Sequence, residues 1–375
     1  MRILIVSQEF PPTVGGAGVV AYQNAIALTR AGHNVSVLTV EPKGVEVPSY
    51  PFDYIAVPRC GRLWVILLSL RIARFELSNG DCLILNDVGA AMAFSMLPKS
   101  LRARCVHFAY LHGGEVDSLI RKVSRRFRVL GVPQRIMSVF SQSDTVISVS
   151  DYMKDYFLTN VEAFRRHRIR YHIETVYAGI DTELFRPTES SVREKYGLAS
   201  TTTVLISVGR IIPQKGFPRM LDLYARLVAE TDSQRFHWLI VGDGTYKPEM
   251  VETAASLGLQ DHVTFVGPVL RSELPQYYSA SDLFWLLSER EAEAFGLVYV
   301  EAQACGVPAL GWNTYGVREA ILPGVTGYLA DSADDVLNIL SNQTFRSLVP
   351  EKILQFAQTF DTKLQAKRLS TILSA

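Results

Sequence analysis

Two glutamates separated by seven residues form the pattern with the clearest chemical use in this sequence. Glu293 precedes a predicted helix and Glu301 lies within it, in the string Glu293-Ala-Phe-Gly-Leu-Val-Tyr-Val-Glu301. Eight residues of helix rise about 12 Å, which is comparable with the separation of the sugar ring and the ribose in a nucleotide-sugar. Glu293 is therefore predicted to accept sugar hydroxyls and Glu301 ribose hydroxyls. The alternative is two solvated glutamates on an amphipathic helix, since most glutamates are exposed.

The start of the same predicted helix offers backbone donors. The amides of Phe295, Gly296 and Leu297 would stand at the helix N-terminus, where unpaired N–H groups and the helix dipole favour a diphosphate or a sugar hydroxyl. Gly296 has no side chain to keep a ligand away from the backbone. These residues are predicted to bind the same ligand as Glu301.

A second loop supplies two cations. It reads Gly209-Arg210-Ile-Ile-Pro-Gln-Lys215-Gly216 and lies between a predicted buried strand and a predicted helix, where phosphates bind in α/β folds. Arg210 and Lys215 are predicted to neutralise a leaving diphosphate as a glycosidic bond breaks, and so to act in catalysis by electrostatic stabilisation. The alternative is a pair of exposed surface cations.

The first loop of the chain, residues 11–18, is rich in proline and glycine. It lacks the spacing of a dinucleotide-binding fingerprint. Gly16 and Gly18 nevertheless lie between a predicted strand and a predicted helix, and they are predicted to let a donor phosphate or sugar approach the backbone. A simple tight turn is the alternative.

His112 follows another predicted strand, in the string His112-Gly-Gly-Glu115. We predict that His112 is catalytic and hydrogen-bonds a sugar hydroxyl or a backbone carbonyl near the anomeric carbon. Glu115 would orient the imidazole or contact an acceptor. The alternative is a structural histidine, which is the more common role of a lone one.

The elements that must position these residues alternate between strands and helices. The first forty residues read as strand, helix, strand at Ile3–Val6, Val19–Arg30 and Val35–Val40, and a second copy of this pattern starts after Asp181. Strand–helix–strand units imply parallel sheets, so we expect an α/β protein with two Rossmann-like domains. Ligands bind at the carboxyl ends of such strands, and a cleft between facing domains would be the site.

The length of 375 residues also suits two domains. We expect an N-terminal domain over 1–182 and a C-terminal domain over 183–359. Residues 41–60 carry several prolines and no periodicity and are interpreted as loop. The four cysteines form no metal-ligand spacing and are interpreted as reduced core residues.

Charge is unevenly distributed although the net charge is only +1, which does not favour nucleic acid as a partner. Residues 1–182 carry 21 Lys and Arg against 15 Asp and Glu, and the remainder carries 17 against 22. Basic stretches at 121–128 and 165–170 favour an anionic or membrane-held acceptor, with a solvated helix face as the alternative. No apolar run is long enough to span a bilayer, and no signal peptide precedes the first strand, so we expect a cytoplasmic protein that contacts the membrane peripherally.

These motifs together resemble the family-four retaining glycosyltransferases of the GT-B fold, and the similarity extends over nearly the whole chain. It rests on the glycine loop at 15–18, the linker Gly179-Ile-Asp-Thr-Glu-Leu-Phe185, the Arg210…Lys215 loop and the Glu293…Glu301 motif. The resemblance implies that the first domain binds the acceptor and that the second domain holds a UDP- or GDP-sugar, with the diphosphate on Arg210 and Lys215. It also implies transfer with retention by front-face attack, and a final helix at about 360–375 that packs back on the first domain.

The resemblance also carries expectations about metals, acceptors and rivals. The chain has no Asp-X-Asp triplet, which metal-dependent glycosyltransferases usually need, so no metal is expected; a cation held by Glu289, Glu291 and Glu293 is the disfavoured alternative. The acceptor is expected to be a glycan or a lipid-linked molecule of bacterial surface polysaccharide or lipopolysaccharide synthesis. Ala178 and Gly316 depart from the usual family pattern.

The rival functions are a nucleotide-sugar epimerase, a phosphorylase, a dinucleotide-dependent oxidoreductase and a carbohydrate-binding module.

Overall fold

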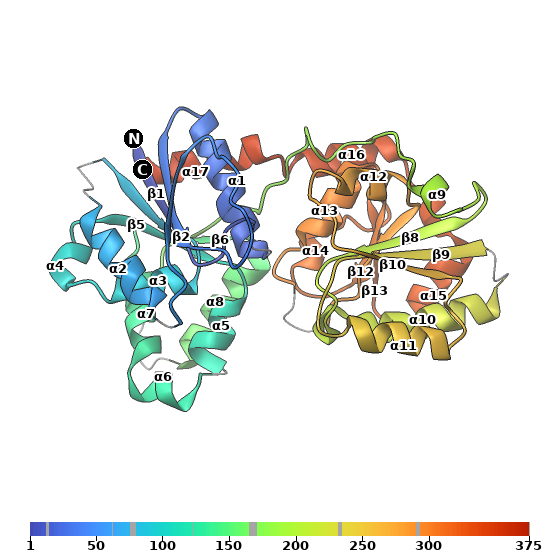
Figure 1. Cartoon of the computed structure of the whole chain (residues 1–375), viewed down its shortest axis with the longest axis horizontal. Helices are drawn as coiled ribbons and strands as arrows, with labels where there is room; N and C mark the ends of the chain where they lie inside the picture. The colour runs from blue at the N-terminus through green and yellow to red at the C-terminus, as the bar shows by residue number, and fades with distance from the viewer. Residues whose placement is uncertain are drawn as a thin grey trace. The chain divides into compact units, whose positions relative to one another are not determined.

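The protein divides into two compact units in the computed structural model (Figure 1). The structure describes residues 1–375 except 13–14, 62, 76–79, 122, 165–170, 232–234, 290–292 and 375, and it does not describe the side chains of 118 and 162–164. Unit 1 comprises Met1–Gly179 and Thr362–Ala375, and unit 2 comprises Ile180–Asp361. The chain therefore crosses between units at 179/180 and 361/362, close to the boundaries drawn from the sequence at 182/183 and about 360.

Unit 1 is built on a parallel sheet in the order β3-β2-β1-β4-β5-β6-β7 within its described residues. Its strands are β1 Arg2–Ser7, β2 Asn34–Val40, β3 Asp53–Val57, β4 Cys82–Leu85, β5 Val106–Leu111, β6 Thr145–Ser148 and β7 Ile173–Thr175. The central strands are mostly apolar and are buried along almost their whole length, as expected for a parallel sheet covered on both faces. The strand order reverses at β1/β4, which is the switch point of a doubly wound fold.

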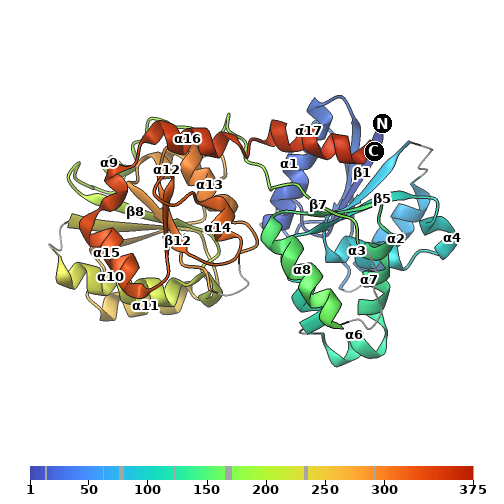
Figure 2. The same cartoon turned by 180° about the vertical axis from the view of Figure 1, so that it is seen from behind.

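Helices cover both faces of this sheet (Figures 1 and 2). They are α1 Gly16–Arg30, α2 Trp64–Arg74, α3 Val88–Ser95, α4 Lys99–Arg102, α5 Gly114–Val116, a π-helical turn at Asp117–Arg121, α6 Arg125–Val129, α7 Val132–Gln142, α8 Asp151–Phe164 and α17 Thr362–Leu373. Helix α3 packs against α2 and α7, and α17 packs against α1. His33 Nε2 lies 3.3 Å from Ser370 Oγ in α17, so the last helix belongs to unit 1 although it follows unit 2 in the chain.

The prediction that residues 41–60 are loop was wrong in part. β3 occupies Asp53–Val57 and pairs with β2 in parallel from Ser36↔Asp53 to Val40↔Val57. The segment is short, its first residue is exposed and its next three are only partly buried, because it is the edge strand. It therefore lacks the apolar run that revealed the central strands. Cys60 is exposed, contrary to its interpretation as a core residue, whereas Cys82 and Cys305 are buried.

Unit 2 repeats the architecture with the sheet order β10-β9-β8-β11-β12-β13. Its strands are β8 Thr203–Val208, β9 Phe236–Val241, β10 Val263–Gly267, β11 Leu283–Trp285, β12 Ala309–Trp312 and β13 Gly327–Ala330. Its helices are α9 Val192–Lys195, a 3-10 turn Pro213–Lys215, α10 Phe217–Glu230, α11 Lys247–Ser256, α12 Leu274–Ser279, α13 Leu297–Ala304, α14 Val317–Ala320, α15 Ala333–Asn342, a 3-10 turn Thr344–Ser347 and α16 Pro350–Gln358. All the strand pairs in the described residues are parallel.

The predicted fold class is confirmed, because both units are doubly wound α/β structures with Rossmann-like topology. Helices α10, α11 and α15 lie on one face of the second sheet, and α12, α13 and α16 lie on the other (Figures 1 and 2). The loops that carry the candidate residues follow β1, β4 and β5 in unit 1 and β8 and β11 in unit 2. They therefore lie at the carboxyl edges of the two sheets.

Candidate active site

The loop between β8 and α10 brings Lys215 to Glu293. Lys215 Nζ lies 2.6 Å from Glu293 Oε2, and the two side chains are 16% and 13% exposed. Ser288 Oγ donates a second hydrogen bond to the same oxygen at 3.3 Å. Two residues predicted from separate motifs, 78 positions apart, thus form one charge-assisted pair.

A glycine allows the loop after β8 to lie this close to the loop after β11. Gly216, directly after Lys215, has φ 82° and is the N-cap residue just before α10. A Cβ built on Gly216 would lie 1.9 Å from the carbonyl oxygen of Leu287, so no other residue fits without displacing the backbone. Gln214 O accepts a hydrogen bond from Glu289 N at 2.9 Å. The two loops are therefore joined through their backbones as well as through the ion pair.

Arg210 lies in the same loop with an exposed side chain. Its neighbours are held by the loop after β9, since Gly209 N donates to Val241 O at 3.0 Å and Ile211 N to Asp243 O at 2.9 Å. Among the described residues no ion pair to Arg210 occurs, in contrast to Lys215. The backbone around Arg210 is thus fixed while its guanidinium remains accessible to a ligand at the carboxyl edge.

The N-terminus of α13 has the form expected for an anion site. Gly296 has φ 95° and is the residue before the helix, and no described side chain caps the first turn, so the first amides are not all satisfied within the helix. Phe295 is buried, with its ring centroid 5.1 Å from that of Phe360. A Cβ on Gly316 would lie 2.0 Å from Ala294 O. These contacts hold the backbone of residues 294–297 in one orientation.

Glu301 has an environment that the sequence did not reveal. Its side chain is 2% exposed, and its Oε1 lies 2.6 Å from the guanidinium of Arg271. Tyr278 donates its hydroxyl hydrogen to Glu301 Oε2 at 3.3 Å, and burial followed by the nearby Glu301 charge raises the pKa of Tyr278 well above its usual range. Both carboxylate oxygens are therefore engaged within the unit. The role of Glu301 toward a ribose stays a prediction.

Arg271 is a functional candidate that sequence reasoning missed. It follows β10 at the carboxyl edge, its side chain is 32% exposed, and its guanidinium lies 4.8 Å from the ring centroid of Phe185. The sequence signal that could have identified Arg271 is its position as a cation just after a predicted strand of the second domain. No motif spacing connected Arg271 with Glu301, because the two residues meet only through tertiary packing.

In unit 1, His112 at the end of β5 contacts Asn86 at the end of β4. Asn86 is fully buried and its Nδ2 donates to Ser7 Oγ and to Ala17 O, both at 3.0 Å. A carbonyl oxygen only accepts, so the amide nitrogen must face Ala17. The amide oxygen then faces His112 Nε2 at 3.4 Å.

This contact defines the state of His112. Burial lowers the pKa of His112 to about 4, with hydrogen bonding to Asn86 opposing the shift. The imidazole is therefore neutral near pH 7, with the proton on Nε2 and the lone pair on Nδ1. The ring also stacks on Tyr110, with centroids 5.4 Å apart. Such a histidine offers a fixed hydrogen-bond acceptor rather than a titrating acid.

The surrounding loops of unit 1 are tied together by Asp87. Its Oδ2 accepts from Ser7 Oγ at 2.9 Å and Gln8 N at 2.6 Å, while its Oδ1 accepts from Ala90 N at the start of α3. A Cβ on Gly18 would lie 2.9 Å from Glu9 O, whereas Gly16 has open space around it. Packing therefore requires a glycine at position 18, whereas Gly16 leaves the start of α1 accessible.

Glu115 binds its own loop. Its Oε2 accepts from Gly113 N at 2.6 Å, the residue is 3% exposed, and burial raises the pKa of its carboxyl group. The carboxylate stabilises the turn after His112. The two roles predicted for Glu115, contact with an acceptor and orientation of the His112 imidazole, do not follow from this geometry.

The described part of the chain contains no group of three His, Cys, Asp or Glu side chains that could hold a metal ion. Glu291 of the disfavoured Glu289–Glu291–Glu293 site lies outside the described residues, as do Lys122 and the basic stretch 165–170. In the described segments, no helix is both long and apolar enough to cross a bilayer. The expected cleft between the domains concerns their relative placement and stays a prediction.

Comparisons with known proteins cover both units. Residues 14–184 match the family model described as Glycosyltransferase Family 4, and residues 189–342 match that described as Glycosyl transferases group 1. N-acetyl-alpha-D-glucosaminyl L-malate synthase of Bacillus anthracis is 28% identical over 334 residues, covering 86% of this chain and 82% of the relative. A GDP-mannose-dependent phosphatidylinositol monomannoside mannosyltransferase of Mycolicibacterium smegmatis is 28% identical over 354 residues, covering 88% and 86%.

The fold comparison agrees. The crystal structure of Anabaena HepE in complex with UDP and glucose superimposes with a TM-score of 0.79 and 21% identity, over 100% of this chain and 99% of that chain. Two doubly wound units with these matches define a glycosyltransferase of the GT-B type. The chain belongs to the family-four glycosyltransferases.

Proposed function

We propose that the chain transfers a hexose from a UDP- or GDP-sugar to a glycan or lipid-linked acceptor, with retention of configuration and without a metal ion. The observation that carries the proposal is the Lys215–Glu293 pair at the carboxyl edge of the second sheet. It joins a cation suited to a diphosphate with a carboxylate suited to sugar hydroxyls. The relatives support a sugar nucleotide, since one is GDP-mannose-dependent by name and the HepE structure holds UDP and glucose.

In this proposal the donor diphosphate lies near Arg210, Lys215 and the first amides of α13. As the bond between the anomeric carbon and the phosphate oxygen breaks, negative charge grows on the diphosphate. Preoriented cations and amides stabilise that charge most in the transition state. The acceptor oxygen bonds to the same face of the anomeric carbon, and its proton passes to the leaving phosphate oxygen.

The remaining residues position the sugar. Glu293 accepts hydroxyl hydrogens of the donor sugar once the diphosphate shares Lys215. His112, neutral and with a lone pair on Nδ1, accepts a hydrogen bond rather than supplying a proton. Since the leaving phosphate takes the acceptor proton, the reaction needs no other base and no covalent intermediate on Glu293.

Thermal unfolding with a panel of nucleotides, with and without EDTA, tests the donor. Binding to the native state raises the Tm by mass action. We expect a shift with UDP or GDP and its sugars that EDTA does not change and that Lys215→Ala abolishes. No shift with any nucleotide, or a shift with NAD alone, would contradict the proposal.

Product analysis separates transfer from the rival reactions. Incubating the donor identified above with candidate acceptors should give free nucleoside diphosphate and a glycosylated acceptor whose anomeric configuration matches that of the donor. An epimerase would return an isomer of the donor sugar, and an oxidoreductase would change the absorbance of a nicotinamide. Either result would exclude the transferase proposal.

We further propose that a basic and apolar surface of unit 1 contacts anionic lipid near the acceptor, in the synthesis of a bacterial surface polysaccharide or lipopolysaccharide. In and beside α6, Phe127, Val129 and Leu130 are 41%, 80% and 63% exposed. Arg125, Arg126 and Arg128 surround them, and none of the α6 residues is buried. Exposed apolar side chains among cations suit the interface of an anionic bilayer.

Vesicle sedimentation tests this contact. The wild-type chain should sediment with phosphatidylglycerol-containing vesicles at low salt and be released by high salt, because screening weakens surface attraction. Replacing Arg125, Arg126 and Arg128 by Ser should abolish sedimentation, whereas replacing Arg30, Arg59 and Arg104 should not. Unchanged sedimentation and activity in the first variant would remove the membrane from the proposal.

A further inference from the structure

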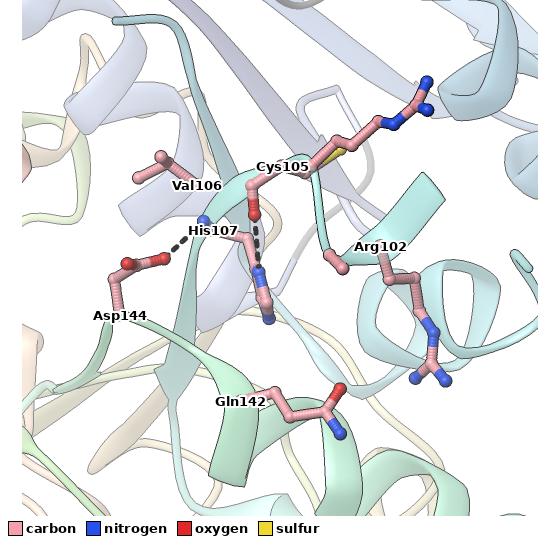
Figure 3. A pocket seen from close by; sticks show the side chains of 8 residues that line it. Arg102, Cys105, Val106, His107, Gln142 and Asp144 are labelled. Atoms are coloured by element: carbon pink, nitrogen blue, oxygen red, sulfur yellow. Dashed lines mark hydrogen bonds between the residues drawn. The ribbon is translucent and has the colours of Figure 1, made fainter. Parts of the chain in front are cut away.

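A pocket of about 290 Å³ opens at the amino end of β5 in unit 1 (Figure 3). Its lining includes Arg102, Arg104, Cys105, His107, Gln142 and Asp144. His112 follows the other end of the same strand. At about 3.3 Å per residue the two ends of β5 are roughly 17 Å apart, so the pocket is separate from the candidate active site.

Arg102 is the feature that calls for an explanation. The residue is 9% exposed, and its Nε is buried without a hydrogen-bond partner. Within the residues that the structure describes, its guanidinium forms no ion pair either. A guanidinium stays charged at any physiological pH, and a buried charge is normally paired. In Figure 3 the Arg102 guanidinium and the Gln142 amide extend toward the same side of the pocket.

The rest of the pocket lining is held by hydrogen bonds and carries acceptors. Asp144 Oδ2 accepts from His107 N at 3.0 Å, and Cys105 O lies 3.0 Å from His107 Nδ1. Burial lowers the pKa of His107, so that ring is neutral. Asp144 and Gln142 line the pocket and are exposed, and Gln142 Nε2 donates to Ser138 Oγ. The pocket thus offers carboxylate and amide oxygens as acceptors.

We propose that this pocket binds a small hydroxylated anion of the sugar-phosphate class. The phosphate would pair with Arg102, with Arg104 as the second cation on the wall, and the hydroxyls would donate to Asp144 and Gln142. Two cations against one carboxylate favour an anion over a neutral sugar. The volume is near the small end of the range for ligand sites, roughly 300 to 1,000 Å³, which suits one sugar ring rather than a nucleotide-sugar. The site is additional to the transfer reaction and does not depend on it.

Titration calorimetry with glucose 6-phosphate tests the site in the full chain. We expect saturable binding to the wild type, at least tenfold weaker binding to Arg102→Gln, and unchanged binding to Lys215→Ala, which keeps the pocket and alters the proposed donor site. Glucose should not bind measurably. The proposal is overturned by no binding to the wild type at millimolar concentration, or by equal binding to Arg102→Gln. Loss in Lys215→Ala with none in Arg102→Gln would likewise overturn it, since the ligand would then occupy the donor site.

A second variant keeps the test independent of the folding of Arg102→Gln. Asp144→Asn retains an oxygen that accepts from His107 N but removes the negative charge. Inorganic phosphate should then bind several-fold more tightly, while the preference for glucose 6-phosphate over inorganic phosphate should fall. If Asp144→Asn leaves the affinities of both ligands unchanged, neither ligand lies in this pocket and the proposal fails.

Discussion

The ammonium of Lys215 lies 2.6 Å from Glu293 Oε2, so the cation and the carboxylate of the candidate site form an ion pair. Both side chains are more than four-fifths buried, and Ser288 also donates to Glu293. An incoming diphosphate must therefore share Lys215 with Glu293 or displace it. The two residues are expected to act as one unit in binding and in catalysis.

Removing either partner should accordingly reduce the same step. We expect Lys215→Ala and Glu293→Gln each to lower kcat/KM on the order of 10²–10³-fold, the usual cost of losing one transition-state contact. The double variant should lose far less than the product of the two losses, because residues in one unit are not additive. Steady-state kinetics of all four forms measures this coupling, and multiplicative losses would show that the residues act separately.

The close contact at Gly216 predicts a stability effect with a matched control. Gly216→Ala meets both a positive φ and the carbonyl of Leu287, whereas Gly258 has φ 70° with nothing within 4 Å of a built Cβ. Gly258→Ala should cost roughly 1–2 kcal/mol for the left-handed conformation alone. Gly216→Ala should cost clearly more and also weaken nucleotide binding. Urea unfolding of the two variants decides the matter, and equal losses would mean that the Leu287 contact is relieved cheaply.

The pairing of the buried Glu301 with the partly exposed Arg271 predicts a compensating double variant. Arg271→Ala leaves a carboxylate that is 2% exposed without its cation, which should cost about 3–5 kcal/mol of unfolding free energy. Adding Glu301→Gln removes the stranded charge and should restore a large part of that loss. Chemical denaturation measures both steps. No recovery in the double variant would indicate that Arg271 stabilises the unit through its packing on Phe185 instead.

His112 should remain neutral throughout the range of enzyme assays. Because burial depresses the pKa of folded His112 to about 4, its neutral state contributes stability above pH 6.5, and that contribution is lost as the pH falls toward 4. Asp87 and Glu115 have pKa values raised by burial, which acts in the opposite direction on total stability. Imidazole NMR is therefore the appropriate measurement, and it should show a neutral ring protonated at Nε2 at pH 6.

Asn86 supplies the matching variant. Asn86→Asp places a carboxylate beside the imidazole, so the pKa of His112 should rise and a new step should enter the pH dependence of kcat/KM near neutrality. Asn86→Leu should free the ring tautomer without adding a charge. Nε2 protonation that is unchanged in Asn86→Leu would show that Tyr110 stacking, rather than the amide, determines the tautomer.

Local sequence patterns were sufficient to predict the architecture of two parallel sheets. The apolar runs Ile3–Val6 and Val204–Val208 and the helices that follow them predicted two parallel sheets, because a strand buried on both faces must be apolar throughout. The edge strand β3 was missed since it is only half covered. The loops with the candidate residues His112 and Lys215 follow β5 and β8, as predicted, and each lies at the carboxyl edge of its own sheet.

The sequence alone therefore determined the fold class, the family and the two motifs that carry Lys215 and Glu293. Only the tertiary structure decided which side chains meet. Arg271 reaches Glu301, Asn86 orients His112, and Glu115 turns back to the amide of Gly113. The first two contacts join residues 30 and 26 positions apart, which no short-range spacing encodes. Their geometry depends on the packing of strands and helices, and burial then lowers the pKa of His112 and raises that of Glu115.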